Sequence, residues 1–130
     1  MADERPDWQK IGEEFIQLYY SRFDTGNRSS LGELYYQSAW MTWEGEMFHG
    51  KEVIVNKLTT LPFKTIQHNI TKQDCQPTPD NCIVVMVMGQ LKADNDPVMG
   101  FQQVFQLRNE LGSWGCSNDM FRLSIHNFGA

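Results

Sequence analysis

The chain of 130 residues lacks a surplus of positive charge. Lys and Arg total 11 against 16 for Asp and Glu, the formal net charge is -5, and the basic residues are scattered without a run. Proteins that bind nucleic acid usually carry a basic patch. The sequence therefore argues against a nucleic-acid partner, and its acidic balance favours basic protein surfaces.

Cysteine pairs and long apolar runs are also missing. Cys75, Cys82 and Cys116 are odd in number and lack the C-x-x-C spacing, which argues against a disulfide framework and a zinc site. No apolar run approaches membrane-spanning length, and no apolar segment follows the charged residues 3–7 as it would in a signal peptide. We therefore expect a soluble intracellular protein in a reducing compartment.

Patterns typical of catalytic sites are scarce. The three imidazoles, His49, His68 and His126, show neither the i, i+4 helical spacing of a metal site nor a neighbouring Ser or Cys that they could activate. The glycines lie at strand kinks and turns and form no phosphate-cradling loop. The sequence predicts no metal and no cofactor, and it favours a binding protein over an enzyme.

Length and composition indicate one globular domain, which we expect to span residues 1–130. Hydrophobic residues at 41% and charged residues at 21% are ordinary globular values. A chain of this length can bury roughly two thirds of its unfolded surface in a single core.

Helical segments are expected to precede most of the strands. Apolar residues recur at helical spacing between Pro6 and Gly26, which predicts an amphipathic helix of about five turns. A short helix is expected over 30–36, and a third helix follows Gly50 and ends at Pro62, because the residue before a proline is disfavoured in helical geometry. The expected buried side of the third helix consists of Val53, Ile54, Leu58 and Leu61.

From residue 63 onward the sequence indicates strands, expected at 64–74, 82–93, 98–107 and 114–127. Consecutive strands joined by short turns should pair antiparallel. The run 82–88 is apolar throughout, which predicts a central strand covered on both faces. A second set of apolar residues alternates along the last strands and also needs burial, which a homodimer through an open sheet face would supply. This set is Phe101, Phe105, Leu107, Phe121, Leu123 and Ile125.

Two carboxylates, Asp94 and Asp96, lie on a turn between strand-like runs that carry apolar side chains. An acidic rim beside an apolar surface suits a partner that offers a basic side chain next to an aromatic one. Trp43 and Glu44 repeat this pairing on a short predicted strand. Structural alternatives are open: the two aspartates as turn formers, Trp43 as a core residue beside a solvated Glu44, and Trp8 as a staple of the first helical turn.

Blocks along the chain resemble the nuclear transport factor 2 family. They include Trp8-Gln9-Lys10-Ile11-Gly12, Thr42-Trp43-Glu44-Gly45, Leu61-Pro62-Phe63, Gly89-Gln90-Leu91-Lys92-Ala93-Asp94 and Asn118-Asp119-Met120-Phe121-Arg122, and the likeness runs from Trp8 to Gly129. The resemblance implies an α+β fold, a cone-shaped domain of three helices wrapped on a bent antiparallel β-sheet (nuclear transport factor 2-like or cystatin-like). It also implies a homodimer formed through the sheet.

The resemblance further implies a nuclear import carrier and not an enzyme. Such a carrier binds the small GTPase Ran in its GDP form and FxFG-repeat nucleoporins, and it moves between the cytoplasm, the nuclear pore and nuclear envelope, and the nucleoplasm. The family's Ran site carries over to Trp43, Glu44, Leu61, Ile66, Asp94, Asp96 and Met99, where the apolar members would receive an aromatic side chain and the acids would pair with Lys or Arg. The nucleoporin site carries over to Trp8, Met120 and Arg122.

Two alternatives stay open beside the carrier. The cone-shaped fold also hosts small-molecule isomerases and dehydratases, for which His68 with Asp74 or Asp24 is the loose candidate acid–base pair. The other alternative is an export or scaffold subunit that pairs with a different chain of the same fold. One departure from the family pattern is Asn95, which stands where some relatives carry a charge and slightly lowers the local field.

Overall fold

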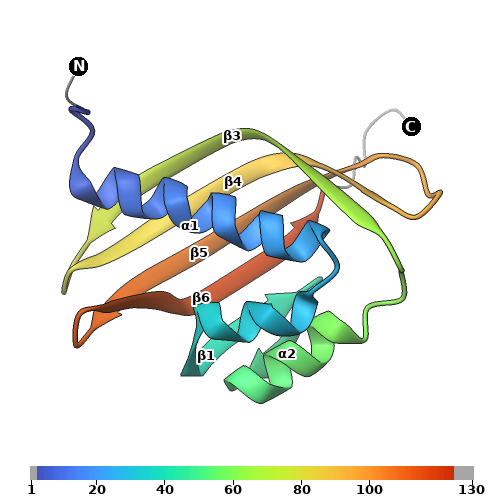
Figure 1. The fold of residues 1–130 in the computed structure, drawn as a ribbon, viewed down its shortest axis with the longest axis horizontal. Coiled ribbons are helices and arrows are strands. Elements are labelled where there is room, and N and C mark those ends of the chain that lie inside the picture. Colours follow the sequence, from blue (N-terminus) through green and yellow to red (C-terminus); the bar gives the residue numbers. More distant parts are fainter. Residues whose placement is uncertain (1–2, 125–130) are drawn as a thin grey trace.

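The structure is a computed structural model and describes residues 3–124 (Figure 1). Its elements in chain order are α1 (Asp7–Asp24), the 3-10 helix η1 (Arg28–Leu34), β1 (Tyr35–Trp43), β2 (Glu46–His49), α2 (Lys51–Thr59), β3 (Ile66–Thr78), β4 (Cys82–Ala93), β5 (Met99–Glu110) and β6 (Ser113–Leu123). The predictions for Ile125, His126 and the end of the last strand lie outside the described residues. The single domain over 1–130 likewise stays a prediction.

The strands form one six-stranded sheet in the order β2-β1-β6-β5-β4-β3. From β3 to β6 each strand pairs antiparallel with the next, as expected. The β1 strand pairs parallel with β6, a contact between distant segments that no local pattern signals. Helix α1 crosses one face of the sheet, and α2 lies beside β1 (Figure 1). The expected α+β architecture of three helices on a bent sheet is confirmed, apart from this one parallel pair.

The helices follow their apolar spacing, but the bounds of η1 and the end of α2 differ from those predicted. The buried side of α1 consists of Gly12, Phe15, Ile16, Tyr19, Tyr20 and Phe23. The short helix predicted at 30–36 is displaced by two residues, since η1 runs from Arg28 to Leu34 and Tyr35 begins β1. Helix α2 ends at Thr59, ahead of Pro62. Val53 is 49% exposed, so its predicted place on the buried side is wrong.

Helix α1 covers the inner face of the sheet. Phe101, Phe105, Leu107 and Phe121 are buried there, and Phe105 contacts Phe15 and Tyr19 of α1 with ring centroids 5.3 and 4.8 Å apart. These side chains therefore need no second copy for their burial. The sequence argument for a homodimer was wrong about which residues would require it.

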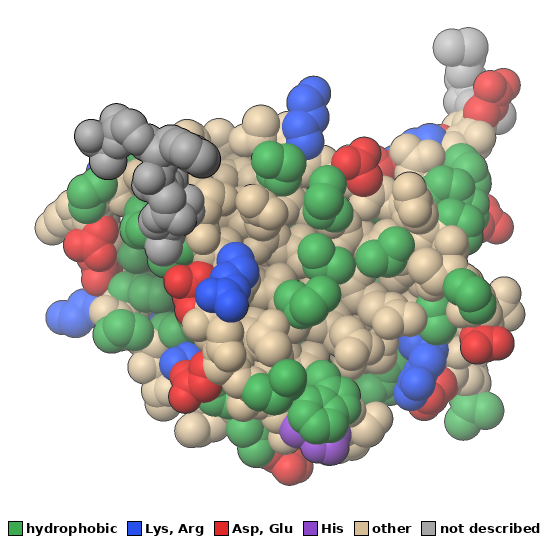
Figure 2. Space-filling model, turned by 180° about the vertical axis from the view of Figure 1, so that it is seen from behind, with side chains coloured by type: hydrophobic (Ala, Val, Ile, Leu, Met, Phe, Trp, Pro, Cys, Tyr) green, Lys and Arg blue, Asp and Glu red, His purple; other side chains and the backbone are tan. Residues whose placement is uncertain are grey.

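The opposite face of the sheet, which we call the open face, is covered by no helix of residues 3–124 (Figure 2). Five paired residues cross its middle in one row, namely Met86, Val104, Met120, Thr42 and Met47. Met86 and Met88 of β4 are 38% and 46% exposed, so in one copy of the chain only the inner face of this strand is covered, and the predicted cover of its second face stays a prediction. In Figure 2 hydrophobic side chains spread over the middle of this face, and most charged side chains lie nearer its edges.

Candidate functional site

The predicted Ran-binding residues lie on the β1–β2 turn, on the α2–β3 connection with the start of β3, and on the β4–β5 turn with the start of β5 (Figure 1). Ile66 pairs with Ala93, and the Asp94 N–H donates to the Thr65 carbonyl at 2.9 Å. Met99 pairs with Leu91 on the inner face and is 38% exposed. Leu61 and Ile66 are buried. We call the set Leu61, Ile66, Asp94, Asp96 and Met99, together with Trp43 and Glu44, the acidic end.

Asp94 holds two loops together. Its carboxylate accepts hydrogen bonds from the backbone N–H groups of Thr65 at 2.9 Å and Lys64 at 3.1 Å, and from the Thr65 hydroxyl at 3.2 Å. These bonds, led by that from the Thr65 N–H, lower the pKa of Asp94. Within residues 3–124 the carboxylate of the exposed Asp96 accepts no hydrogen bond. Asp94 therefore has the structural role of a turn former, and Asp96 is the freer anion of the two.

Trp43 ends β1 and Glu44 follows it, and contacts with β6 hold both side chains. The Trp43 ring is half-buried and stacks on Phe121, with centroids 4.0 Å apart, and Phe121 lies 5.9 Å from Phe101 in the core. Glu44 begins a tight turn between β1 and β2, in which it and Gly45 both have positive φ. Its carboxylate accepts the Leu123 N–H at 2.5 Å. The Trp43 ring is thus held against Phe121 of β6, and the Glu44 carboxylate is hydrogen-bonded to the backbone of the same strand.

Arg28 and Phe63 are parts of this end that residue patterns did not single out. The Arg28 guanidinium donates to the carbonyls of Leu58 and Phe63 at 2.8 and 3.1 Å, and it lies 4.7 Å from the centre of the Phe63 ring. These contacts hold the segment that carries Leu61. Arg28 precedes that segment by more than thirty residues, so no local signal could have linked the two.

The candidate acid–base pair of the enzyme alternative is present in the interior. His68 Nδ1 lies 2.6 Å from Asp24 Oδ1, and the His68 backbone N–H donates to Asp24 Oδ2 at 2.9 Å. The His68 side chain is only 2% exposed, under the rings of Tyr20 and Phe23. Asp74 pairs with Met86 on the open face, away from this histidine. The pair fastens α1 to β3, and its imidazole is sealed from any substrate.

A polar network fills the centre of the cone with the chain's own side chains. The Asp119 carboxylate accepts hydrogen bonds from the Tyr35 hydroxyl at 2.6 Å and from Gln103 Nε2 at 2.8 Å. Gln103 Oε1 accepts from the Tyr20 hydroxyl at 2.5 Å, and the Tyr35 hydroxyl oxygen, whose proton goes to Asp119, lies 3.3 Å from the Tyr19 hydroxyl and accepts from it. Burial raises the pKa of Asp119 to about 6, although its two hydrogen bonds oppose the shift.

This buried acid predicts a pH dependence of stability. Because its pKa is higher in the folded chain, Asp119 contributes stability that is fully present below its unfolded pKa and is lost as the pH rises through about 6. We expect Asp119→Asn to reduce the gain in unfolding free energy between pH 7.5 and 5 by roughly 1–2 kcal/mol. Urea denaturation of both proteins at one protein concentration measures this. Identical pH slopes would contradict the assignment.

Trp8 lies at the other end of α1, in a hollow of about 320 Å³. The hollow is bordered by the first turns of α1, the β3–β4 turn and Trp114 of β6. Trp8 and Trp114 are both half-buried and pack against the core. Trp8 is therefore both a staple of the helix and part of a surface hollow, which its sequence position alone could not distinguish. Trp114 was not among the predicted residues, because nothing local marks it.

Met120 and Arg122 lie apart from Trp8 in a single copy of the chain. Met120 is 52% exposed on the open face, where it borders a hollow of about 350 Å³ with Trp40 and Met47. The Arg122 guanidinium is packed on the β1–β2 turn, 3.1 Å from the position that a side-chain carbon at Gly45 would take. The structure does not bring the three predicted nucleoporin-binding residues into one surface of one copy.

No helix among residues 3–124 is long and apolar enough to cross a membrane. Within the same residues no group of three metal-binding side chains is present.

Comparisons with known proteins agree on one family. The family model described as nuclear transport factor 2 (NTF2) domain matches residues 11–123. A probable nuclear transport factor 2 of Caenorhabditis elegans is 47% identical over 128 residues, covering 94% of this chain and 96% of that protein. Nuclear transport factor 2 of Saccharomyces cerevisiae is 40% identical over 120 residues, covering 91% and 95%.

Solved structures give the same result for the fold. Nuclear transport factor 2 from Cryptosporidium parvum superposes with a TM-score of 0.86 at 40% identity, covering 95% of this chain and 100% of that one. A putative scytalone dehydratase from Novosphingobium aromaticivorans reaches a TM-score of 0.76 at 11% identity, covering 90% and 85%. At that identity the likeness shows a shared fold alone.

Proposed function

The chain belongs to the nuclear transport factor 2 family, and on this premise we propose that it carries Ran in its GDP form from the cytoplasm into the nucleus. The relatives named nuclear transport factor 2 are similar over nearly their whole length, so the chain is a nuclear transport carrier and not an enzyme, and it is nucleocytoplasmic. The finer steps that we propose are contact with FxFG nucleoporins, formation of a homodimer, and residence in the cytoplasm, at the nuclear pore and envelope, and in the nucleoplasm.

The observation that carries the Ran proposal is the acidic end, where the exposed Glu44 follows the half-buried Trp43 and the exposed Asp94 and Asp96 precede the partly exposed Met99. Met99 and the half-buried Trp43 offer contact to a foreign aromatic ring, whose burial contributes roughly 1.5–3 kcal/mol. Glu44 and Asp96 are the anions placed to pair with Lys or Arg of Ran. Asp94 fixes the turn beneath them, and Leu61 and Ile66 form its buried support.

Discrimination between the two nucleotide states would arise on the Ran side. Switch loops of small GTPases rearrange when the γ-phosphate is present. An aromatic anchor and its basic neighbours on such a loop would then move too far from the acidic end to contact it. The chain itself needs no nucleotide contact for this selectivity.

The open face supports the proposed homodimer. The row that includes Met86, Val104 and Met120 presents apolar side chains that no helix of the described residues 3–124 covers. A second copy meeting this face through a twofold axis would bury the same patch on both subunits. The neighbouring hollow beside Trp40 would be filled in the same contact.

The nucleoporin site follows from the dimer. Because Trp8 and Met120 lie on different faces of one copy, we propose that Trp8 of one subunit works with Met120 and Arg122 of the partner subunit. The hollow at Trp8, of about 320 Å³, has room for a single Phe ring. Weak, quickly reversed contacts of this kind suit a carrier that passes many repeats.

Trp8→Ala should weaken FxFG binding and leave Ran binding intact. We expect about a tenfold loss in affinity for an FxFG peptide, since an aromatic contact in a surface hollow contributes on the order of 1–2 kcal/mol. Fluorescence anisotropy with a labelled peptide measures the loss. Trp8→Phe, which keeps a ring packed on the core, is the matched variant and should bind within about threefold of the unmodified chain. Equal loss of Ran binding in Trp8→Ala would contradict separate sites.

The carrier role itself is tested by nuclear import in permeabilised cells. Fluorescent GDP-bound Ran should accumulate in nuclei only when the chain is added. Accumulation at the same rate without the chain would overturn the proposal.

A further inference from the structure

A third surface lies along the side of α1, away from both ends of the helix. It is a groove of about 690 Å³ lined by residues of α1 and β3, and β3 is an edge strand of the sheet (Figure 1). Its walls are Glu13, Glu14, Ile16 and Gln17 of α1 and residues 70–73 of β3, and Arg5 borders it from the N-terminal segment. None of these residues belongs to the acidic end or to the hollow at Trp8.

The chemistry of the groove favours a cationic donor with an aliphatic stem. Ile16 and Ile70 provide apolar floor, and Glu13 and Glu14 provide carboxylates. Gln73 Oε1 is a buried acceptor for which no donor is present among residues 3–124. Lys72 is the one positively charged residue that β3 contributes to the rim of the groove. In the strand register it lies opposite the exposed Met88, so this position of β3 faces the open side of the sheet.

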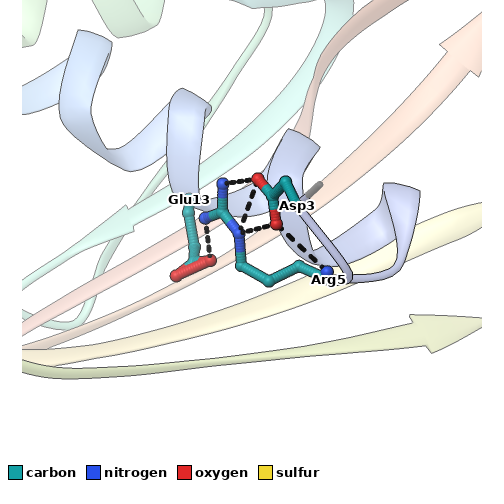
Figure 3. Close-up of polar contacts among 3 residues, drawn as sticks. All are labelled: Asp3, Arg5 and Glu13. Atoms are coloured by element: carbon teal, nitrogen blue, oxygen red, sulfur yellow. Dashed lines mark hydrogen bonds and ion pairs between the residues drawn. The ribbon is translucent and has the colours of Figure 1, made fainter. Parts of the chain in front are cut away.

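The chain's own Arg5 already makes the contact that such a ligand would make (Figure 3). Arg5 Nη1 donates to Glu13 Oε1 at 2.7 Å, while Nε and Nη2 donate to Asp3 at 3.0 and 2.6 Å. The Arg5 side chain is 46% exposed and that of Glu13 is 25% exposed. Exposed ion pairs of this kind add little to stability, so an incoming ligand could displace Arg5 at small cost.

We propose that the groove between α1 and β3 is a docking site for an arginine side chain on an extended segment of another protein, with Arg5 occupying it in the free chain. A guanidinium offers a planar set of five donors, which suits separate acceptors on α1 and β3 better than a lysine ammonium does. The stem of the arginine would lie on the apolar floor, as long basic side chains commonly do.

Recognition here would use the side chain and not strand addition. Although β3 lies at the edge of the sheet, its pairing shifts register between Ile70 and Lys72. Such a bulge, with a lysine at the edge, disfavours the regular backbone pairing of an added strand.

Titration of the ¹⁵N-labelled chain with N-acetyl-arginine amide tests the proposal directly. In Arg5→Ala the backbone signals of residues 70–73 and the Gln73 side-chain amide should shift, with an affinity about fivefold higher than in the unmodified chain. Adding Glu13→Gln to that variant should lower the affinity at least about fivefold, because the charged acceptor is lost. Glu33→Gln, which removes the partner of Arg22 elsewhere, is the matched control and should change nothing at these signals.

N-acetyl-citrulline amide, which keeps the shape of arginine but not its charge, completes the test. It should shift the same signals less than arginine amide at every concentration. Equal shifts from both probes, equal affinities with and without Arg5, or no shift at residues 70–73 in Arg5→Ala would each overturn the proposal. The experiment uses no Ran and no nucleoporin, so its outcome is independent of the carrier function.

Discussion

Glu44→Lys is expected to abolish binding of GDP-bound Ran, with a loss in affinity of at least about a hundredfold. The lysine would place a positive charge where the proposal puts basic residues of Ran, and like charges at an interface cost several kcal/mol. The exposed carboxylate beside Trp43 is the basis of this expectation. Isothermal titration calorimetry with GDP-loaded Ran measures the change.

Two matched variants separate charge from structure at this turn. Glu44→Gln keeps an oxygen that can accept the Leu123 N–H, and we expect it to lose less affinity than Glu44→Lys. Glu46→Lys reverses a charge on the same hairpin, where Glu46 contacts Lys57 at 3.5 Å, and it should bind within about threefold of the unmodified chain. Equal losses in Glu44→Lys and Glu46→Lys, or full affinity in Glu44→Lys, would contradict the proposed role.

Val104→Glu is expected to convert the proposed homodimer into a monomer. Val104 lies in the middle of the open face, between Met86 and Met120. A dimer would bury two unpaired carboxylates against apolar side chains, which costs several kcal/mol per ion. Sedimentation equilibrium should report about 30 kDa, twice 15.1 kDa, for the unmodified chain and 15.1 kDa for the variant.

Leu18→Glu provides the control for this experiment. Leu18 is an exposed apolar residue on α1, away from the open face, so the same substitution there should leave the dimer intact. A monomeric unmodified chain, or an unchanged mass in Val104→Glu, would contradict the proposed interface. A stable complex with a different chain of the same fold, in place of self-association, would favour the scaffold alternative.

Local patterns predicted the elements well where hydrophobic periodicity was strong. The spacing between Pro6 and Gly26 predicted α1, and the strand expected at 82–93 has the bounds of β4. The predicted element bounds were wrong where a helix and a strand compete for the same residues. Tyr35 and Tyr36 were expected in a helix, but they begin β1. The parallel β1–β6 pair was beyond reach, because it joins segments more than seventy residues apart.

Faces were harder to predict than elements. Apolar residues on both sides of β4 indicated two covers, and one copy of the chain supplies the inner cover alone. The residues named as needing a second copy, such as Phe101 and Phe105, are covered by α1. Which of two apolar faces meets the helix depends on tertiary packing, and alternation along one strand does not contain that information.

The residues of the candidate site were predicted from the family resemblance more than from the chemistry of their side chains. Residue types alone left Asp94 and Asp96 open as turn formers, and the structure gives Asp94 that structural role while leaving Asp96 exposed. Sequence reasoning missed Arg28, which holds the loop carrying Leu61. Such supporting contacts depend on long-range packing and show no spacing of their own.

The most direct test of the carrier account is a calorimetric comparison of Ran in its two nucleotide states. GDP-loaded Ran should bind the chain with one site per subunit. Ran loaded with a non-hydrolysable GTP analogue should bind at least about a hundredfold more weakly, because its switch loop no longer presents the aromatic and basic groups. Equal affinity for both forms, or no binding of the GDP form, would contradict the account.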